Sequence, residues 1–152
     1  MILYLDSSAI VKEYISESGS GETLAAVEQA ETIGTAVLSR VEVIAAFHKA
    51  VRVNVISQDD ANRTIRAFNK RWRDLVRTRV TERLVKHASE LAGSQSLRGY
   101  DAVHLASAAA WQQAIGRNVT LATFDLQLWR SARKIGLSVF PENPPEQRRG
   151  GR

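Results

Sequence analysis

Four acidic residues of this sequence each stand at the start of a predicted helix. Asp6 and Asp125 directly follow short apolar runs. Glu42 lies in the first turn of its helix, where Ser39 and Glu42 match the capping-box pattern, and Asp101 begins an alanine-rich helix. Each acid alone is explained by the free N–H groups and the positive dipole at a helix N-terminus. The repetition of the arrangement indicates a shared chemical role.

If the four carboxylates converge, they would suit Mg²⁺ or Mn²⁺, because hard cations prefer oxygen ligands. The chain contains no cysteine, which excludes a disulfide framework, a thiolate zinc site and a cysteine nucleophile. Without a cation, mutual repulsion would raise the pKa values of some of these carboxyls. A bound ion polarises a phosphodiester and lowers the pKa of a bound water. Converging acids therefore predict hydrolysis of phosphodiester bonds.

The order of the predicted elements explains how distant acids could meet. Apolar runs predict strands at 2–5, 32–38, 119–123 and 137–140, with a candidate edge strand at 75–80. Predicted helices alternate with these strands, at 9–15, 18–30, 39–53, 57–73, 81–95, 102–115 and 125–135. This alternation implies an α/β fold with a central, mainly parallel sheet of about four to five strands flanked by helices. Asp6 and Asp125 are expected at the carboxyl edge of that sheet.

Length and composition predict one packed domain. A chain of 152 residues, 44% hydrophobic and 24% charged, matches ordinary globular usage. Residues 1–141 carry the predicted elements, whereas 142–152 read as a flexible basic tail. The first apolar run is too short for a signal peptide and no stretch would span a bilayer, so we expect a cytoplasmic protein without a membrane partner. The net charge of +5 suggests a polyanionic partner.

The segments around the four acids resemble the motifs of PIN-domain ribonucleases of the VapC toxin family. The resemblance covers Met1 to Pro141. The four motifs are, in order, Tyr4-Leu-Asp-Ser-Ser-Ala9 followed by Val11-Lys12, Ser39-Arg-Val-Glu42, Arg98-Gly-Tyr-Asp-Ala-Val-His-Leu-Ala106, and Thr123-Phe-Asp125 followed by Leu128, Ala132, Gly136 and Pro141. All four acids of the family are present.

This resemblance implies a single PIN-like domain in which Asp6, Glu42, Asp101 and Asp125 form the catalytic site. They would hold a divalent metal ion, directly or through water. The implied activity is that of an endoribonuclease, the toxin of a toxin–antitoxin pair, which cuts RNA with metal-activated water. The resemblance also implies a homodimer and a cognate VapB-like antitoxin, which could block the acidic pocket with a cationic side chain.

Three further side chains lie next to the acids in these motifs. Ser7 and Thr123 are second-shell candidates, because their hydroxyls could orient a carboxylate or a water. An N-cap role is equally open for Ser7. His104 follows Asp101 by three residues on the same helix, but its apolar neighbours favour a packed structural histidine over a ligand or a base.

Basic residues crowd the segment 63–83, with Trp72 among them. They are Arg63, Arg66, Lys70, Arg71, Arg73, Arg77, Arg79 and Arg83. Arginines with an aromatic residue could hold phosphates and stack a base, whereas the alternative is a solvated helix face. Helical spacing spreads these residues around the axis, so no individual phosphate contact is assigned.

Three other functions stay open at this point. A catalytically inactive PIN-like domain could bind nucleic acid, but a binder has no need of four intact acids. A phosphatase with Asp6 as covalent nucleophile would usually carry a second aspartate two residues on, where this chain has Ser8. A purely structural or protein-interaction module would leave the acids as helix caps.

Overall fold

The central element of the fold is a sheet of five parallel strands in the order β3-β2-β1-β4-β5. The computed structural model describes residues 1–146. The strands are β1 (Ile2–Leu5), β2 (Thr32–Ala36), β3 (Val76–Thr78), β4 (Val119–Ala122) and β5 (Ser138–Phe140). Seven helices occupy the rest of the described chain: α1 (Ser7–Lys12), α2 (Ser20–Gln29), α3 (Ser39–Arg52), α4 (Gln58–Arg71), α5 (Glu82–Gln95), α6 (Gly99–Ile115) and α7 (Leu126–Lys134). The predicted α/β fold with a parallel sheet is confirmed.

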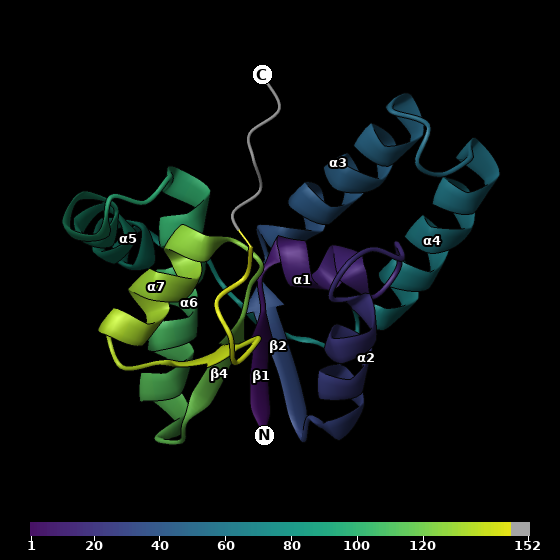
Figure 1. The fold of residues 1–152 in the computed structure, drawn as a ribbon. Coiled ribbons are helices and arrows are strands. Elements are labelled where there is room, and N and C mark those ends of the chain that lie inside the picture. The colour runs from purple at the N-terminus through teal and green to yellow at the C-terminus, as the bar shows by residue number, and fades with distance from the viewer. Residues whose placement is uncertain (147–152) are drawn as a thin grey trace.

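Helices cover both faces of the sheet, which is why all four side chains of β1 are buried. Ile2 and Tyr4 join one apolar cluster, whereas Leu3 and Leu5 join the other, because successive side chains of a strand point to opposite faces. Figure 1 shows helices α1 to α4 on one side of the sheet and α5 to α7 on the other. The central strand therefore holds the two cores together and fixes the position of the acid that follows it.

Helix α6 packs closely against the sheet and carries Asp101 in its first turn. At Gly34 of β2, an added Cβ would come within 2.7 Å of the Trp111 ring, so glycine is needed for this close approach. One face of α6 is buried, with Ala102, Leu105, Ala106, Ala108 and Trp111 in the core, as its lack of formal charge beyond Asp101 predicts. Asp101 is therefore positioned by a helix that packs against the sheet.

Two of the four helices that begin at an acid start earlier than predicted. Helix α1 begins at Ser7 instead of residue 9, because Asp6 serves as its N-cap. Helix α6 begins at Gly99 instead of residue 102. In the predicted tail, 142–146 form no helix or strand, and 147–152 lie outside the described residues. Within residues 1–146, none of the helices combines the length and apolar character needed to cross a membrane.

Candidate functional site

Two of the acids follow neighbouring strands at the point where the strand order reverses. From β1 the chain first adds β2 and β3 on one side, and later adds β4 and β5 on the other. Ligands of open α/β sheets bind outside the carboxyl ends of the strands at such a switch point. Asp6 directly follows β1, and Asp125 lies three residues after β4 ends at Ala122. The structure therefore brings these two acids to the edge where the sequence placed them.

Asp6 is the most enclosed of the four acids, with 3% of its surface exposed. Its carboxylate accepts hydrogen bonds from the hydroxyl of Ser8 at 2.7 Å, from the backbone N–H of Ala9 at 2.8 Å and from the hydroxyl of Thr123. Burial raises the pKa of the Asp6 carboxyl above its usual value, although the charge of His104 and the three donors act in the opposite direction. Further positive charge at this place would stabilise the ionised form.

Thr123 connects Asp6 with Asp125. Its hydroxyl is buried, donates to Oδ2 of Asp6 and accepts the backbone N–H of Asp125 at 3.1 Å. The Thr123 hydroxyl therefore contacts one of the acids, as expected of a group that orients a carboxylate. Asp125 itself is the N-cap of α7, since its Oδ1 accepts the N–H of Leu128 at 2.8 Å.

The second hydroxyl beside Asp6 belongs to Ser8. It donates to Asp6 and accepts the backbone N–H of Phe124 at 3.0 Å, which ties α1 to the segment after β4. The N-cap role considered for Ser7 is wrong, because Asp6 occupies that position. The sequence does not predict this role for Ser8, because the motif does not show that the turn directs the Ser8 hydroxyl back to Asp6.

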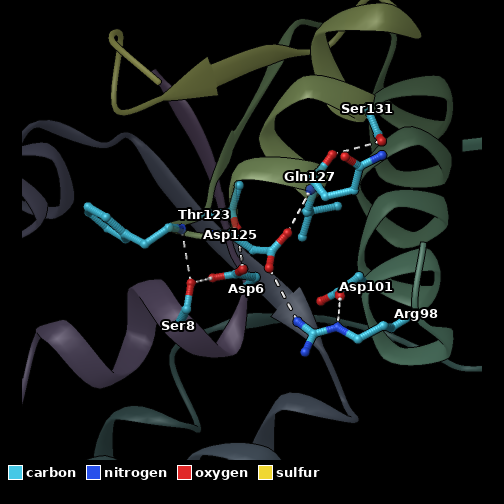
Figure 2. A network of polar contacts seen from close by, with 10 residues as sticks. Asp6, Ser8, Arg98, Asp101, Thr123, Asp125, Gln127 and Ser131 are labelled. Carbon is cyan, nitrogen blue, oxygen red and sulfur yellow. Dashed lines mark hydrogen bonds and ion pairs between the residues drawn. The ribbon is translucent and has the colours of Figure 1, made fainter. Parts of the chain in front are cut away.

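The guanidinium of Arg98 lies between Asp101 and Asp125, as Figure 2 shows. Its Nε donates to Oδ2 of Asp101 at 2.9 Å, and its Nη2 donates to Oδ2 of Asp125 at 3.2 Å. Burial raises the pKa of Asp101, the hydrogen bond from Arg98 opposes this shift, and the charge of Asp125 adds to it. Positive charge is therefore already engaged by these two carboxylates.

Glu42 reaches the site through a pairing with His104 of α6. A hydrogen bond of 2.7 Å joins Oε1 of Glu42 to Nε2 of His104, and a second of 2.9 Å joins Nδ1 to the hydroxyl of Tyr4. Burial lowers the pKa of His104, whereas the hydrogen bond to Glu42 and the charges of Asp6, Glu42 and Asp101 raise it. Together the raising effects are larger, so the pKa of His104 lies above its usual value. His104 is buried, as predicted, and it also positions Glu42. Its three-residue spacing from Asp101 was the available signal for that second role.

The capping box predicted from Ser39 and Glu42 is wrong. The N-cap of α3 is Leu38, and no side chain caps this helix. The buried hydroxyl of Ser39 shares a hydrogen bond of 2.6 Å with the hydroxyl of Thr35 instead. Glu42 consequently turns towards His104 and the neighbouring acids.

Hydrogen bonds connect Asp6, Thr123, Asp125, Arg98 and Asp101 at one edge of the sheet. Glu42 is held by its hydrogen bond to His104. Glu42, Arg98 and Asp101 also line a pocket of about 380 Å³ with Gly99 and Tyr100. A larger space of about 820 Å³ beside Phe124 contains none of the four acids in its lining.

The four acids supply oxygen donors, the kind of ligand that a divalent cation prefers. Within residues 1–146, however, no three His, Cys, Asp or Glu side chains are arranged around one point as ligands of an ion. Instead, the guanidinium of Arg98 bridges two of the carboxylates. Oxygen donors that already engage a cationic group, next to a buried carboxyl with a raised pKa, suit Mg²⁺ or Mn²⁺.

Trp72 does not offer a face for base stacking, because it belongs to the core. It is 8% exposed, and its ring lies 5.6 Å from that of Phe68 between centroids. Three of the nearby arginines have local partners. Arg63 pairs with Asp60, Arg71 pairs with Glu13 at 3.5 Å, and Arg77 donates to the carbonyl of Leu75 at 3.2 Å. Phosphate contact by the exposed basic residues of this region stays a prediction.

Known proteins of similar sequence cover nearly the whole chain. The PIN domain family model matches residues 3–134. The chain is 31% identical over 140 residues to the ribonuclease VapC45 of Mycobacterium tuberculosis strain CDC 1551, covering 92% of this chain and 95% of that protein. The same identity and coverage hold for the ribonuclease VapC49 of Mycobacterium tuberculosis strain H37Rv.

Solved structures share the fold at much lower sequence identity. VapBC2 from Rickettsia felis, bound to a promoter DNA fragment, matches with a TM-score of 0.61 and 14% identity, over 91% of this chain and 97% of that chain. VapBC-1 from nontypeable Haemophilus influenzae matches with a TM-score of 0.62 and 16% identity, over 91% and 96%. These likenesses concern the arrangement of the strands and helices.

Proposed function

The chain belongs to the PIN-domain family, with VapC ribonucleases as its relatives, and from this premise we propose that it is a metal-dependent endoribonuclease toxin. The observation that carries the proposal is the network of Asp6, Asp125 and Asp101 at the switch point of the sheet, with Glu42 lining the same pocket as Asp101. RNA is the proposed substrate because the relatives named above are ribonucleases, and the net charge of +5 favours a polyanion. We also infer a cytoplasmic site of action, because cellular RNA is the proposed substrate.

Mg²⁺ or Mn²⁺ would be held by Asp101 and Asp125, with Asp6 and Glu42 completing the ligand set directly or through water. When bound, the ion supplies polarisation of the scissile phosphodiester and a lowered pKa for an attacking water. Asp6 contributes a carboxylate whose direction is fixed by three donors. Such fixed geometry removes the cost of reorganising the site during the reaction.

We propose Glu42 as the proton acceptor, in which case it would contact the metal ion through water. Its Oε1 is engaged by His104, and the carboxyl group lines the pocket with Asp101. Hydrolysis forms a bond from the water oxygen to phosphorus and breaks the phosphorus–oxygen bond to one nucleotide. The proton lost by the water passes to Oε2 of Glu42 and on to solvent, and the leaving oxygen takes a proton from solvent.

The test of this activity is cleavage of total cellular RNA by the purified, partner-free protein. Reactions with Mg²⁺ or Mn²⁺ are compared with EDTA, with Asp101→Asn and with Asp60→Asn, an exposed carboxylate on α4 that lies outside the network. We expect cleavage by the wild type and Asp60→Asn only, and only with metal. RNA binding without cleavage in every tube would favour the catalytically inactive alternative.

We also propose a small antitoxin as partner and a homodimer as the assembly. Support for the partner comes from the shared fold with VapBC proteins, and both parts rest on the family. Tagged Asp101→Asn protein, expressed in the native host, should copurify with the product of a neighbouring gene. Light scattering of the purified chain should give twice the monomer mass. A monomer, or a host preparation without such a product, would count against the respective part.

A further inference from the structure

Arg98 supplies the acid cluster with a positive charge from the chain itself. Its two hydrogen bonds, of 2.9 Å and 3.2 Å, engage one carboxylate oxygen of Asp101 and one of Asp125. Asp101 lies in the first turn of α6 and Asp125 is the N-cap of α7, and Arg98 is hydrogen-bonded to both carboxylates. The guanidinium therefore lies where a divalent cation would serve the same two groups.

We propose that Arg98 is a resident counter-ion, which a divalent cation displaces from Asp101 and Asp125 and which then binds a phosphate of the RNA. The displacement concerns metal binding alone, whereas the phosphate contact rests on the function proposed above. Arg98 thus has two alternative partners, the two carboxylates and a phosphate of the substrate.

Physical chemistry favours the metal ion in this exchange. Mg²⁺ approaches a carboxylate oxygen to about 2.0–2.1 Å, whereas the nitrogen atoms of Arg98 stay at 2.9 Å and 3.2 Å. The ion also carries twice the charge of a guanidinium, and Coulomb attraction grows with charge and with decreasing distance. Exposed ion pairs such as those of Arg98 are weak in comparison.

Little in the structure holds Arg98 in its present position. Its side chain is 79% exposed, and the residue is the N-cap of α6 in an extended backbone conformation. Release from the acids therefore requires rotation of the side chain without movement of a helix. The residue also lines the pocket beside Glu42, so the released guanidinium stays next to the acids.

A guanidinium freed in this way is well suited to a phosphodiester. Its planar array of donors matches two phosphate oxygens, and charge-assisted hydrogen bonds of this kind are strong. Lys12, by contrast, is already committed, since its Nζ donates to Glu17 at 2.8 Å and to the carbonyl of Ser18 at 2.6 Å. Arg98 is accordingly the better candidate for the phosphate contact.

The test is a calorimetric titration of Mn²⁺ into wild type, Arg98→Ala, Arg98→Lys and Arg117→Ala, combined with RNA cleavage kinetics at saturating Mn²⁺. Arg117 is a matched control, because it pairs with the exposed Glu31 outside the acid network. We expect Arg98→Ala to bind Mn²⁺ roughly three- to tenfold more tightly, the gain from removing weak competing ion pairs. Its KM for RNA should rise roughly tenfold or more, with a smaller change in kcat.

Arg98→Lys should bind Mn²⁺ like the wild type and recover part of the RNA affinity, because it keeps the charge without the planar donors. Equal Mn²⁺ affinity in Arg98→Ala and Arg117→Ala would overturn the displacement, and so would loss of Mn²⁺ binding by a folded Arg98→Ala protein. If Arg98→Ala binds Mn²⁺ more tightly but the wild type cleaves no RNA, the displacement of Arg98 is supported and the proposed ribonuclease activity is refuted. An unchanged KM in Arg98→Ala would refute the phosphate contact.

Discussion

The two ends of the acid network differ in how their charge is held. At one end, Asp6 is 3% exposed and accepts hydrogen bonds from two hydroxyls and a backbone N–H. At the other, the side chains of Asp101 and Asp125 are 17% and 31% exposed and share the largely solvated guanidinium of Arg98. Fixed donors hold the first end and a side-chain cation holds the second. We therefore infer that the buried end fixes the direction of the Asp6 carboxylate, whereas the exposed end exchanges the charge of Arg98 for that of a metal ion.

This difference has an energetic basis. Buried hydrogen bonds to an ionised group are strong, and leaving one unmade is costly because water cannot replace the donor. Exposed ion pairs contribute little, since solvent and salt screen them. Substitutions at the buried end should accordingly reduce activity most, and those at exposed pairs least.

The largest effect should follow removal of the charge at the buried end. Asp6→Asn keeps the shape and the N-cap of α1, because asparagine caps helices as well as aspartate does. We expect kcat for RNA to fall by at least roughly a hundredfold, since even residues that only support metal ligands can contribute that much. Quantitative cleavage assays with Asp60→Asn as control measure the loss. Full activity in Asp6→Asn would contradict the claim that the buried end of the network contributes most to activity.

The next effect in size should come from the hydroxyl that links the two ends. Thr123→Val preserves the volume but removes the bond to Asp6 and the acceptor for the N–H of Asp125. Activity should fall by roughly ten- to a hundredfold. Thr120→Val, on the strand β4 that precedes Thr123, serves as control, and its activity should match the wild type. If both variants behave alike, the connecting role of Thr123 is refuted.

A smaller effect is expected where the buried support is one step further from the acids. Tyr4→Phe leaves Nδ1 of His104 without its partner, and His104 holds Glu42. The unmatched buried nitrogen should cost about 1–3 kcal/mol of unfolding free energy in urea titrations, and activity should fall a few-fold. Tyr14→Phe, in the other apolar cluster, is the control. Equal stability of the two variants would show that the Tyr4 hydroxyl contributes nothing.

The smallest effect should come from an exposed pair away from the site. Arg117→Ala removes two hydrogen bonds to Glu31, of 3.0 Å and 2.8 Å. Both side chains are more than half exposed, so screening leaves the pair little influence. The thermal midpoint and RNA cleavage should match the wild type. A loss of cleavage would mean that exposed charges matter here more generally, and the contrast with Arg98 would disappear.

Sequence reasoning placed Asp6 and Asp125 correctly because a parallel sheet dictates where strand-to-helix turns meet. The alternation of strands and helices was sufficient for this step, as was the uncharged character of α6 for its burial. These features follow from periodicity, which is local in the chain.

What the sequence did not reveal depends on contacts between distant segments. Ser39 pairs with Thr35 instead of capping α3, and Glu42 pairs with His104, which lies 62 residues away. The bridge from Arg98 to Asp125 likewise joins two helices. A side chain with several competing partners chooses among them only in three dimensions, so local patterns such as the capping box fail at these positions.

The most direct test of this account is a crystal structure of the protein soaked with Mn²⁺, with the ion located by its anomalous scattering. We expect a Mn²⁺ peak at coordination distance from Asp101 and Asp125, on the side of Asp6, with Arg98 turned away from both carboxylates. A structure at saturating Mn²⁺ in which Arg98 still bridges the two acids, and no peak lies among the four, would contradict it.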